Sequence, residues 1–261
     1  MDILQNNMQN KYKSIPGMLF LVSIFLLFST NSFSQDPPIR ILLATGGGWH
    51  DYESQEILLT RAIEEHLGEQ AIITVLHEGN SEPDHHLSVF QEENWAAGYN
   101  VVIHNTGFGR VTDPEFVAQF VKHHKGTPAV LIHAAIHSYR FAEPADPWFR
   151  FIGLRSMRHE AQREFEVENL EPEHPIMAGF PDSWVSPVDE VYVVEELWGE
   201  ITPLALGWGM ETETWYPVIW THEIENTRVF ATTLGHNNET FEKPEFINVI
   251  INGILWAVDR L

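Results

Sequence analysis

Apolar residues in the first half of the chain gather in short continuous runs, and the segments between these runs have helical spacing. The runs span residues 39–45, 71–76, 101–104 and 128–133. Apolar positions recur every three or four residues over 54–66, and Asp113 followed by Pro114 is a typical start for a helix that runs to residue 124. Apolar strands that alternate with helices indicate a parallel sheet covered on both faces.

The second half of the chain has a different pattern. Polar and apolar residues alternate over 163–167 and 191–194, which is typical of half-exposed strands. Two further runs, 218–222 and 228–233, flank a short polar turn and predict an antiparallel hairpin. Helical spacing over 245–259 predicts a closing helix. Together these elements predict one α/β domain over residues 39–261.

The N-terminal segment has the pattern of a secretory signal peptide. Lys11 and Lys13 precede the apolar run 18–28, and small residues follow at positions 32 and 34. The run is about half the roughly 20 residues that a membrane span needs. We therefore expect residues 1–34 to be a signal peptide, cleaved near Ser34-Gln35, and the mature protein to be periplasmic or secreted without stable membrane association. A retained signal anchor is the alternative.

Composition narrows the classes of function. The chain has 15 basic and 37 acidic residues, for a formal net charge of −22. A nucleic-acid-binding protein needs a basic footprint, and an anionic membrane surface would repel this chain, so neither partner is expected. A neutral ligand, or one captured by a local cation or metal, fits better. Arg140, Arg155 and Arg158 stand out in so acidic a chain, each as a partner for a substrate oxyanion or for a structural salt bridge.

The absence of cysteine excludes disulfides, thiolate metal sites and a cysteine nucleophile. A strand-to-helix elbow for acyl transfer would also need a serine or cysteine, and the fourth run leads instead into His133-Ala134-Ala135. Covalent acyl-enzyme chemistry is therefore not expected.

Histidines follow the predicted strands. In open α/β sheets, ligands bind at the carboxyl ends of the parallel strands. One histidine lies at or just after each of five strands: His50, His77, His104, His133 and His236. We expect several of these side chains to converge on one cleft, the alternative for each being a buried imidazole bonded to backbone. Five others, expected on solvated helix faces or loops, are His66, His85, His86, His123 and His124.

Two kinds of chemistry suit such a cluster, and the residues leave both open. Neutral imidazoles with a carboxylate and an open position suit zinc or iron(II), although the chain has no HExxH motif. General acid–base catalysis on a sugar is the other, because an imidazole titrates near neutral pH. The candidate catalytic residues, and the candidate metal ligands, are His50, His133 and His236. The candidate substrate-binding residues are Trp49, Asp51, His104, Asn105, His137, Tyr139 and Glu223.

Several segments, in the right order, resemble those of the ThuA-like (trehalose-utilisation) family. They are Gly48-Trp49-His50-Asp51, residues 131–135 (LIHAA), 173–176 (EHPI), 179–181 (GFP), 189–192 (DEVY), 217–223 (PVIWTHE), 228–230 (RVF), 233–236 (TLGH) and 239–241 (ETF). The resemblance covers about residues 39–261, and the closing segments are its most specific part.

The resemblance implies a class I glutamine amidotransferase-like fold, a flavodoxin-like three-layer sandwich with a mostly parallel sheet and a C-terminal antiparallel hairpin. It also implies that His236 occupies the position of the amidotransferase catalytic histidine and His133 that of the nucleophilic cysteine. Without that thiol, glutamine amidotransferase activity is not expected. Family members are linked to the use of trehalose and related disaccharides, including steps on 3-keto sugars made by partner dehydrogenases.

The leading hypothesis is therefore an exported enzyme that acts on a sugar or keto-sugar as a hydrolase, lyase or isomerase. His236 is the first choice for acid or base, and His133 for a metal ligand or second acid–base group. The alternative is a non-catalytic carbohydrate-binding or interaction module. The sequence leaves homo-oligomer formation open.

Overall fold

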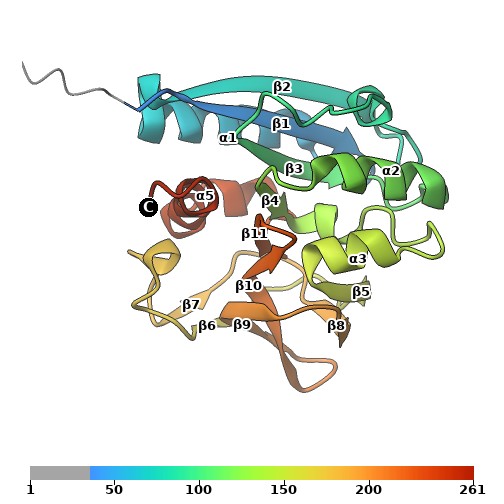
Figure 1. Cartoon of the computed structure of the whole chain (residues 1–261). Coiled ribbons are helices and arrows are strands. Elements are labelled where there is room, and N and C mark those ends of the chain that lie inside the picture. The colour runs from blue at the N-terminus through green and yellow to red at the C-terminus, as the bar shows by residue number, and fades with distance from the viewer. Residues whose placement is uncertain (1–35) are drawn as a thin grey trace, which may run out of the picture. The chain divides into compact units, whose positions relative to one another are not determined.

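The computed structural model describes residues 36–261, and the predicted signal peptide lies outside these residues. Nine strands form the main sheet in the order β2-β1-β3-β4-β11-β10-β9-β6-β7 (Figure 1). The first five strands in this order are parallel to one another. They are β2 (Ala71–Asn80), β1 (Ile39–Gly47), β3 (Val101–Gly107), β4 (Ala129–Ile132) and β11 (Thr227–Thr232).

The remaining strands extend the sheet in antiparallel fashion. They are β10 (Thr214–Ile224), β9 (Ile201–Gly209), β6 (Glu166–Asn169) and β7 (Ser183–Val185). The predicted hairpin is β10–β11, whose pairing closes at Ile224 and Thr227. Its two loop residues, Glu225 and Asn226, both have positive φ, as a tight hairpin turn requires.

Helices cover both faces of the parallel part. α1 (Tyr52–Leu67) and α5 (Pro244–Ala257) pack on one face, while α2 (Pro114–His124) and α3 (Asp146–Ile152) pack on the other (Figure 1). Successive residues of β1 point to opposite faces, so that its Leu42 lies in the core under α2 and its Leu43 in the core under α1. The predicted three-layer α/β arrangement is confirmed.

Shorter elements complete the described chain. A second sheet pairs β5 (Leu154–His159) with β8 (Tyr192–Leu197) in antiparallel fashion. Short helices lie at η1 (Gly68–Gln70), η2 (Ser88–Gln91), η3 (His133–His137), η4 (Pro175–Met177) and α4 (Asn238–Phe241). Among residues 36–261, none of the helices combines the length and the apolar character that crossing a membrane would take.

Two predicted histidine positions need correction. His124 was expected on a solvated helix face, but its side chain is fully buried under α2. His104 was expected in the ligand cleft, but it points from the middle of β3 into the same core, where its Nε2 lies 2.9 Å from Nε2 of His124. α2 is therefore an amphipathic helix whose buried face ends in a histidine instead of an apolar residue.

We expect this buried pair to make stability depend on pH. Burial lowers the pKa of His124 to about 4, and burial together with the charge of His124 lowers that of His104. The unfolded chain takes up protons below about pH 6.5, whereas the folded chain does so only at lower pH. The stability that the neutral pair provides is complete above pH 6.5 and is lost as pH falls towards 4.

The test is chemical unfolding of the His104→Gln/His124→Gln variant at pH 6.5 and pH 5. Between these values its free energy of unfolding should fall less than that of the wild-type protein, with roughly 1.5 kcal/mol of the difference coming from His124 alone. His123→Gln, on the exposed side of the same helix, should behave like the wild type. Equal pH dependence in the double variant and the wild type would refute this account.

Candidate functional site

A cavity of about 370 Å³ opens at the carboxyl ends of the parallel strands. It is lined by Trp49, His50, Gly107, Gly109, Ala134, His137, Arg140, His159, Gln162, Glu190, Tyr192 and His236. These residues come from the loops after β1, β3, β4 and β11 and from β5, β8 and the segments beside them. This is the edge of the sheet at which the sequence predicted a ligand site.

His50 is positioned by the turn between β1 and α1. Its Nδ1 lies 3.2 Å from the carbonyl oxygen of Gly48 and 3.0 Å from the hydroxyl of Tyr52. Gly107, at the end of β3, approaches so closely that a Cβ there would lie 2.1 Å from the Tyr52 hydroxyl. The close approach of the two strand ends therefore requires glycine at position 107 and directs Nε2 of His50 towards the cavity.

His133 follows β4 directly and begins η3. Its φ of +46° lies in the left-handed region, which costs free energy for any residue with a Cβ. Its imidazole is 1% exposed, and Nδ1 donates to the carbonyl oxygen of Thr233 over 2.6 Å. That bond fixes the proton on Nδ1, so the lone pair of Nε2 faces the cavity.

His236 lies in the loop after β11, and buried polar side chains hold this loop on two sides. The carboxylate of Asp189 accepts from the backbone N–H groups of Gly235 and His236 at 2.8 and 3.2 Å. The amide of Gln55 donates to the carbonyl oxygens of the same two residues, and its own oxygen accepts from Asn105. Hydrogen bonds thus hold both the backbone N–H groups and the backbone carbonyl oxygens of this loop. They place Nδ1 of His236 in the cavity.

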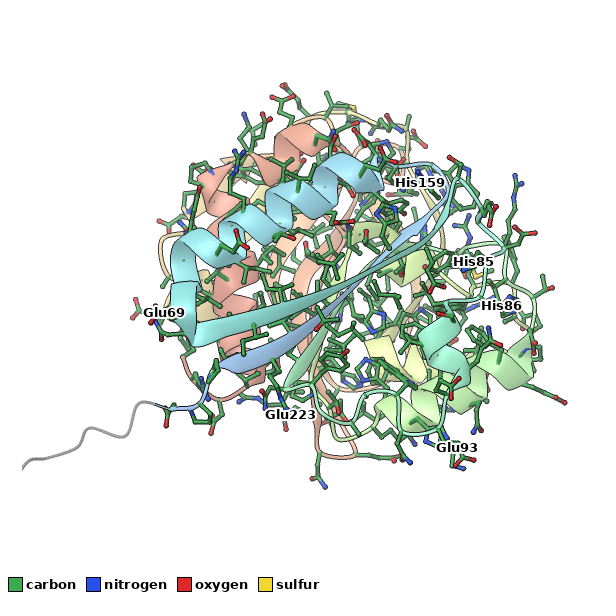
Figure 2. All side chains as sticks on the ribbon, turned by 90° about the horizontal axis from the view of Figure 1, so that it is seen from above. Glu69, His85, His86, Glu93, His159 and Glu223 are labelled. Carbon is green, nitrogen blue, oxygen red and sulfur yellow. The ribbon has the colours of Figure 1, made fainter. Side chains whose placement is uncertain are left out.

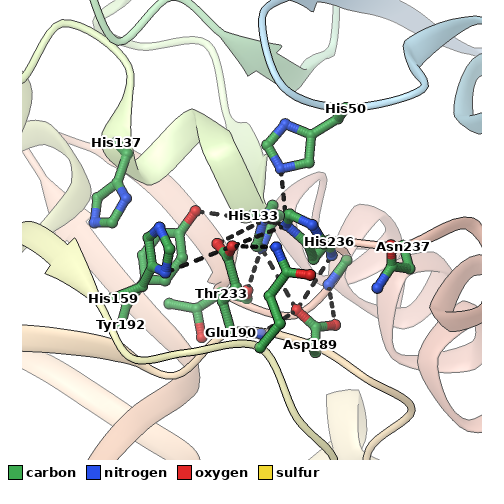
Figure 3. Close-up of polar contacts among 12 residues, drawn as sticks. His50, His133, His137, His159, Asp189, Glu190, Tyr192, Thr233, His236 and Asn237 are labelled. Carbon is green, nitrogen blue, oxygen red and sulfur yellow. Dashed lines mark hydrogen bonds and ion pairs between the residues drawn. The ribbon is translucent and has the colours of Figure 1, made fainter.

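The three imidazoles and one carboxylate meet at one point (Figure 3). Nδ1 of His236 lies 3.1 Å from Nε2 of His50 and 3.3 Å from Nε2 of His133. The Glu190 carboxylate lies beside them, with Oε1 at 3.2 Å from Nδ1 of His236 and Oε2 at 3.5 Å from Nε2 of His133. The nitrogen atoms of the three histidines lie within 4.8 Å of one another.

Part of this geometry matches the coordination shell of a tetrahedral metal ion, while the three histidine nitrogens spread over up to 4.8 Å. Bonds of about 2.0–2.2 Å would place neighbouring ligand atoms about 3.3–3.6 Å apart, and the contacts of His236 with His133 and Glu190 have nearly that spacing. Histidines that bind a metal usually donate their other ring N–H to a carbonyl or carboxylate. His133 does so to Thr233, and Gly48 offers the same acceptor to His50.

Electrostatics keeps two of the imidazoles neutral. Burial, together with the neighbouring imidazoles, lowers the pKa of His50 to about 3. Burial also lowers the pKa of His133 to about 4, against the opposing charge of Glu190. Neutral imidazoles keep the lone pairs that bind a metal or accept a proton.

The pKa shifts of His236 and Glu190, in contrast, favour the charged forms of both groups. Burial would raise the pKa of Glu190, but the hydrogen bond from His236 and the nearby imidazoles outweigh it and lower the pKa to about 2. Burial would lower the pKa of His236, but its hydrogen bond with Glu190 and the charges of Glu190 and Asp189 raise it. The site therefore combines two neutral imidazoles with one imidazole that holds a proton readily.

An aromatic wall bounds the cavity beside this cluster. The rings of His137 and Tyr192 stack at 3.7 Å, and His159 lies 6.0 Å from the Tyr192 ring (Figure 3). Trp49 forms part of the rim with 55% of its surface exposed, and Gly109 lies against its ring. Flat rings therefore stand beside a polar floor in this cavity.

Of the predicted site residues, His50, His236, Trp49 and His137 line this cavity. His133 is buried directly beside His236 and Glu190. Asp51 lies beside it, where it caps α1 through the N–H of Ser54 and accepts from Asn238. His137 is held from behind by the hydroxyl of Ser156 at 2.9 Å.

Four predicted substrate-binding residues lie elsewhere. His104 lies in the core under α2, Asn105 orients Gln55, and Tyr139 is buried among the side chains of Phe120 and Trp148. Glu223 pairs across the hairpin with Arg228 near the amino end of β11. Figure 2 shows Glu223 and His159 on opposite sides of the molecule. Strand position alone did not reveal which face or end of the sheet each side chain occupies.

Sequence reasoning missed Glu190, His159, Tyr192 and Gln162 as lining residues. Glu190 and Tyr192 belong to the segment 189–192 that carries part of the family resemblance, and this was the available signal. His159 is the last residue of β5 and Gln162 follows this strand. No pattern predicted β5, because only its pairing with β8 brings it to the cavity.

Comparison with known proteins bears on the family and the fold. The family model described as "Trehalose utilisation" (ThuA) matches residues 40–257. A structure described as a ThuA-like protein from Parabacteroides merdae is 18% identical, with a TM-score of 0.65 over 85% of this chain and 90% of that one. Another, from Bacteroides uniformis, is 16% identical, with a TM-score of 0.64 over 85% and 93%. Curated proteins gave no match. At these identities the structures confirm the predicted fold class.

We expect the hydrogen bonds of Gln55 to stabilise the loop that carries His236. The Gln55→Leu substitution keeps the size of this buried side chain but leaves the carbonyl oxygens of Gly235 and His236 and the amide of Asn105 without their partner. The free energy of unfolding in urea should fall by about 1–3 kcal/mol. Ile57→Ala, on the exposed side of the same helix, should change it by less than about 0.5 kcal/mol. A Gln55→Leu protein as stable as the wild type would show that this contact is dispensable.

Proposed function

This chain belongs to the ThuA family, described as trehalose utilisation, and from that premise we propose that it is an enzyme acting on a sugar or keto-sugar in the cavity described above. We propose further that His50, His133 and His236 hold a divalent metal ion, zinc or iron(II), at the floor of this cavity. The observation that carries the proposal is the convergence of three imidazole nitrogens and the Glu190 carboxylate on one point.

A bound zinc or iron(II) ion would polarise a carbonyl or hydroxyl oxygen of the sugar. The residues of the chain supply the rest. His50 and His133 offer lone pairs, because burial keeps them neutral. Glu190 lines the cavity beside the cluster, where its negative charge compensates the charge that the imidazoles carry. The ring of Trp49 offers a flat surface to the sugar at the rim.

Acid–base catalysis by His236 alone is the second candidate mechanism. It is favoured by the contact of 3.2 Å between His236 and Glu190, which raises the pKa of His236 and orients its ring. In either mechanism glutamine amidotransferase activity is not expected, because the chain has no cysteine and His133 lies at the turn after β4.

The metal site can be tested without a substrate. Purified protein dialysed against zinc should hold about one ion per chain, measured by inductively coupled plasma mass spectrometry. His133→Ala should bind zinc at least 10- to 100-fold more weakly, since even a change behind a metal ligand has effects of about this size. His123→Ala, on the exposed side of α2, is the matched control. Unchanged zinc content in His133→Ala would remove the metal from the proposal.

Turnover provides the second test. Disaccharides such as trehalose and their 3-keto forms should be consumed by the zinc-loaded protein, and His236→Ala should lower the rate by about 10²–10⁴-fold with its circular dichroism unchanged. Removing the metal with a chelator and then adding it back separates the two mechanisms. Metal-assisted turnover should be lost and then restored, whereas acid–base catalysis by His236 alone should continue without the metal. Sugar binding with no turnover under any of these conditions would instead indicate a carbohydrate-binding module.

A further inference from the structure

We propose that the sugar bound in this cavity carries a carboxylate, and that Arg140 binds it. The inference rests on the proposed function, because it assigns the class of sugar to the same site. It predicts that a sugar acid, or a saccharide with an acidic unit, binds in this cavity more tightly than a neutral sugar.

Arg140 is distinguished by its charge. In the described part of the chain, it is the one lining residue of the cavity with a fixed positive charge, in a protein whose net charge is −22. The short helix η3 starts with His133, which belongs to the histidine cluster, and ends with His137. Arg140 follows three residues later. The chain thus leads directly from the cluster to this guanidinium along one side of the cavity.

The guanidinium takes part in no ion pair within residues 36–261. Among residues 36–261, no carboxylate oxygen lies within 4.0 Å of it. Nη1 donates to the carbonyl oxygen of Met157 at 3.0 Å, and the group lies 5.1 Å from the centre of the Phe141 ring. Nε is buried without a partner. A structural salt bridge therefore does not explain why a half-buried arginine is here.

Glu190, the carboxylate that lines the same cavity, is already satisfied by other groups. Its Oε1 accepts from Gln162 at 3.1 Å and lies 3.2 Å from His236, while its Oε2 lies 3.5 Å from His133. His159 adds a further contact at 3.5 Å. The negative charge of Glu190 is thus shared among the imidazoles, and the positive charge of Arg140 is left for a ligand.

A partly desolvated charge without a partner is costly, and an anionic ligand removes that cost. A guanidinium has five N–H donors in a planar fork that matches a carboxylate, and only one of those of Arg140 is used by the protein. The bond to Met157 and the contact with Phe141 hold the group in place before the ligand arrives. Burial also lowers the pKa of Arg140, and the charges of Tyr192 and Glu190 offset this only in part.

The test compares D-glucuronate, D-glucose and D-glucose 6-phosphate as probes, by isothermal titration calorimetry on the zinc-loaded protein. The wild type should bind glucuronate at least tenfold more tightly than glucose. Arg140→Met, which keeps an apolar stem without the charge, should bind glucuronate about 10- to 100-fold more weakly, as for the loss of a charged hydrogen bond. Its zinc content and its affinity for glucose should not change.

Arg158→Met serves as the control, because Arg158 is an exposed residue of β5 that does not line the cavity. It should bind all three probes like the wild type. If glucose binds as tightly as glucuronate, or Arg140→Met keeps full affinity for glucuronate, the inference is overturned while the proposed sugar site stands. If glucose 6-phosphate binds more tightly than glucuronate and this preference is lost in Arg140→Met, the proposal of a carboxylate is overturned, and the ligand carries a phosphate instead. If none of the sugars binds, the proposed function fails as well.

Discussion

The carboxylate of Glu190 between His133 and His236 is the interaction on which the site depends. Three imidazoles gathered in a buried space would repel one another as soon as two of them were protonated. A neighbouring carboxylate compensates one positive charge, so the cluster can hold a single proton, or a cation in its place, at low cost. Figure 3 shows how the backbone of Asp189 and Glu190 brings this charge under the histidines.

The scaffold keeps these groups in place through its backbone rather than through side-chain packing alone. His133 accepts a left-handed conformation in order to point into the cavity from the end of β4. Gly107 lets the ends of β1 and β3 approach, and Gln55 with Asp189 fixes the loop of His236. Each strand end therefore contributes one rigidly oriented group, which is the preorganisation that catalysis and tight binding both require.

The same cavity has two electrostatic halves. One is the cluster of His50, His133, His236 and Glu190, and the other contains Arg140, which takes part in no ion pair among the described residues and donates to the carbonyl oxygen of Met157. A ligand that spans both would meet oxygen-binding groups at one end and a cation at the other.

The sequence by itself determined the parallel half of the sheet, the helices α1, α2 and α5, the β10–β11 hairpin and the family, because periodicity and local motifs are properties of neighbouring residues. It also indicated His50, His133 and His236, since a residue directly after a parallel strand has only one edge of the sheet to occupy. Only the tertiary structure decided that His104 points into the core and that Glu223 lies at the far end. It alone placed Glu190 and His159 beside the histidine cluster, because β5 and the segment that leads into β8 reach that edge through long-range pairing, which no local pattern encodes.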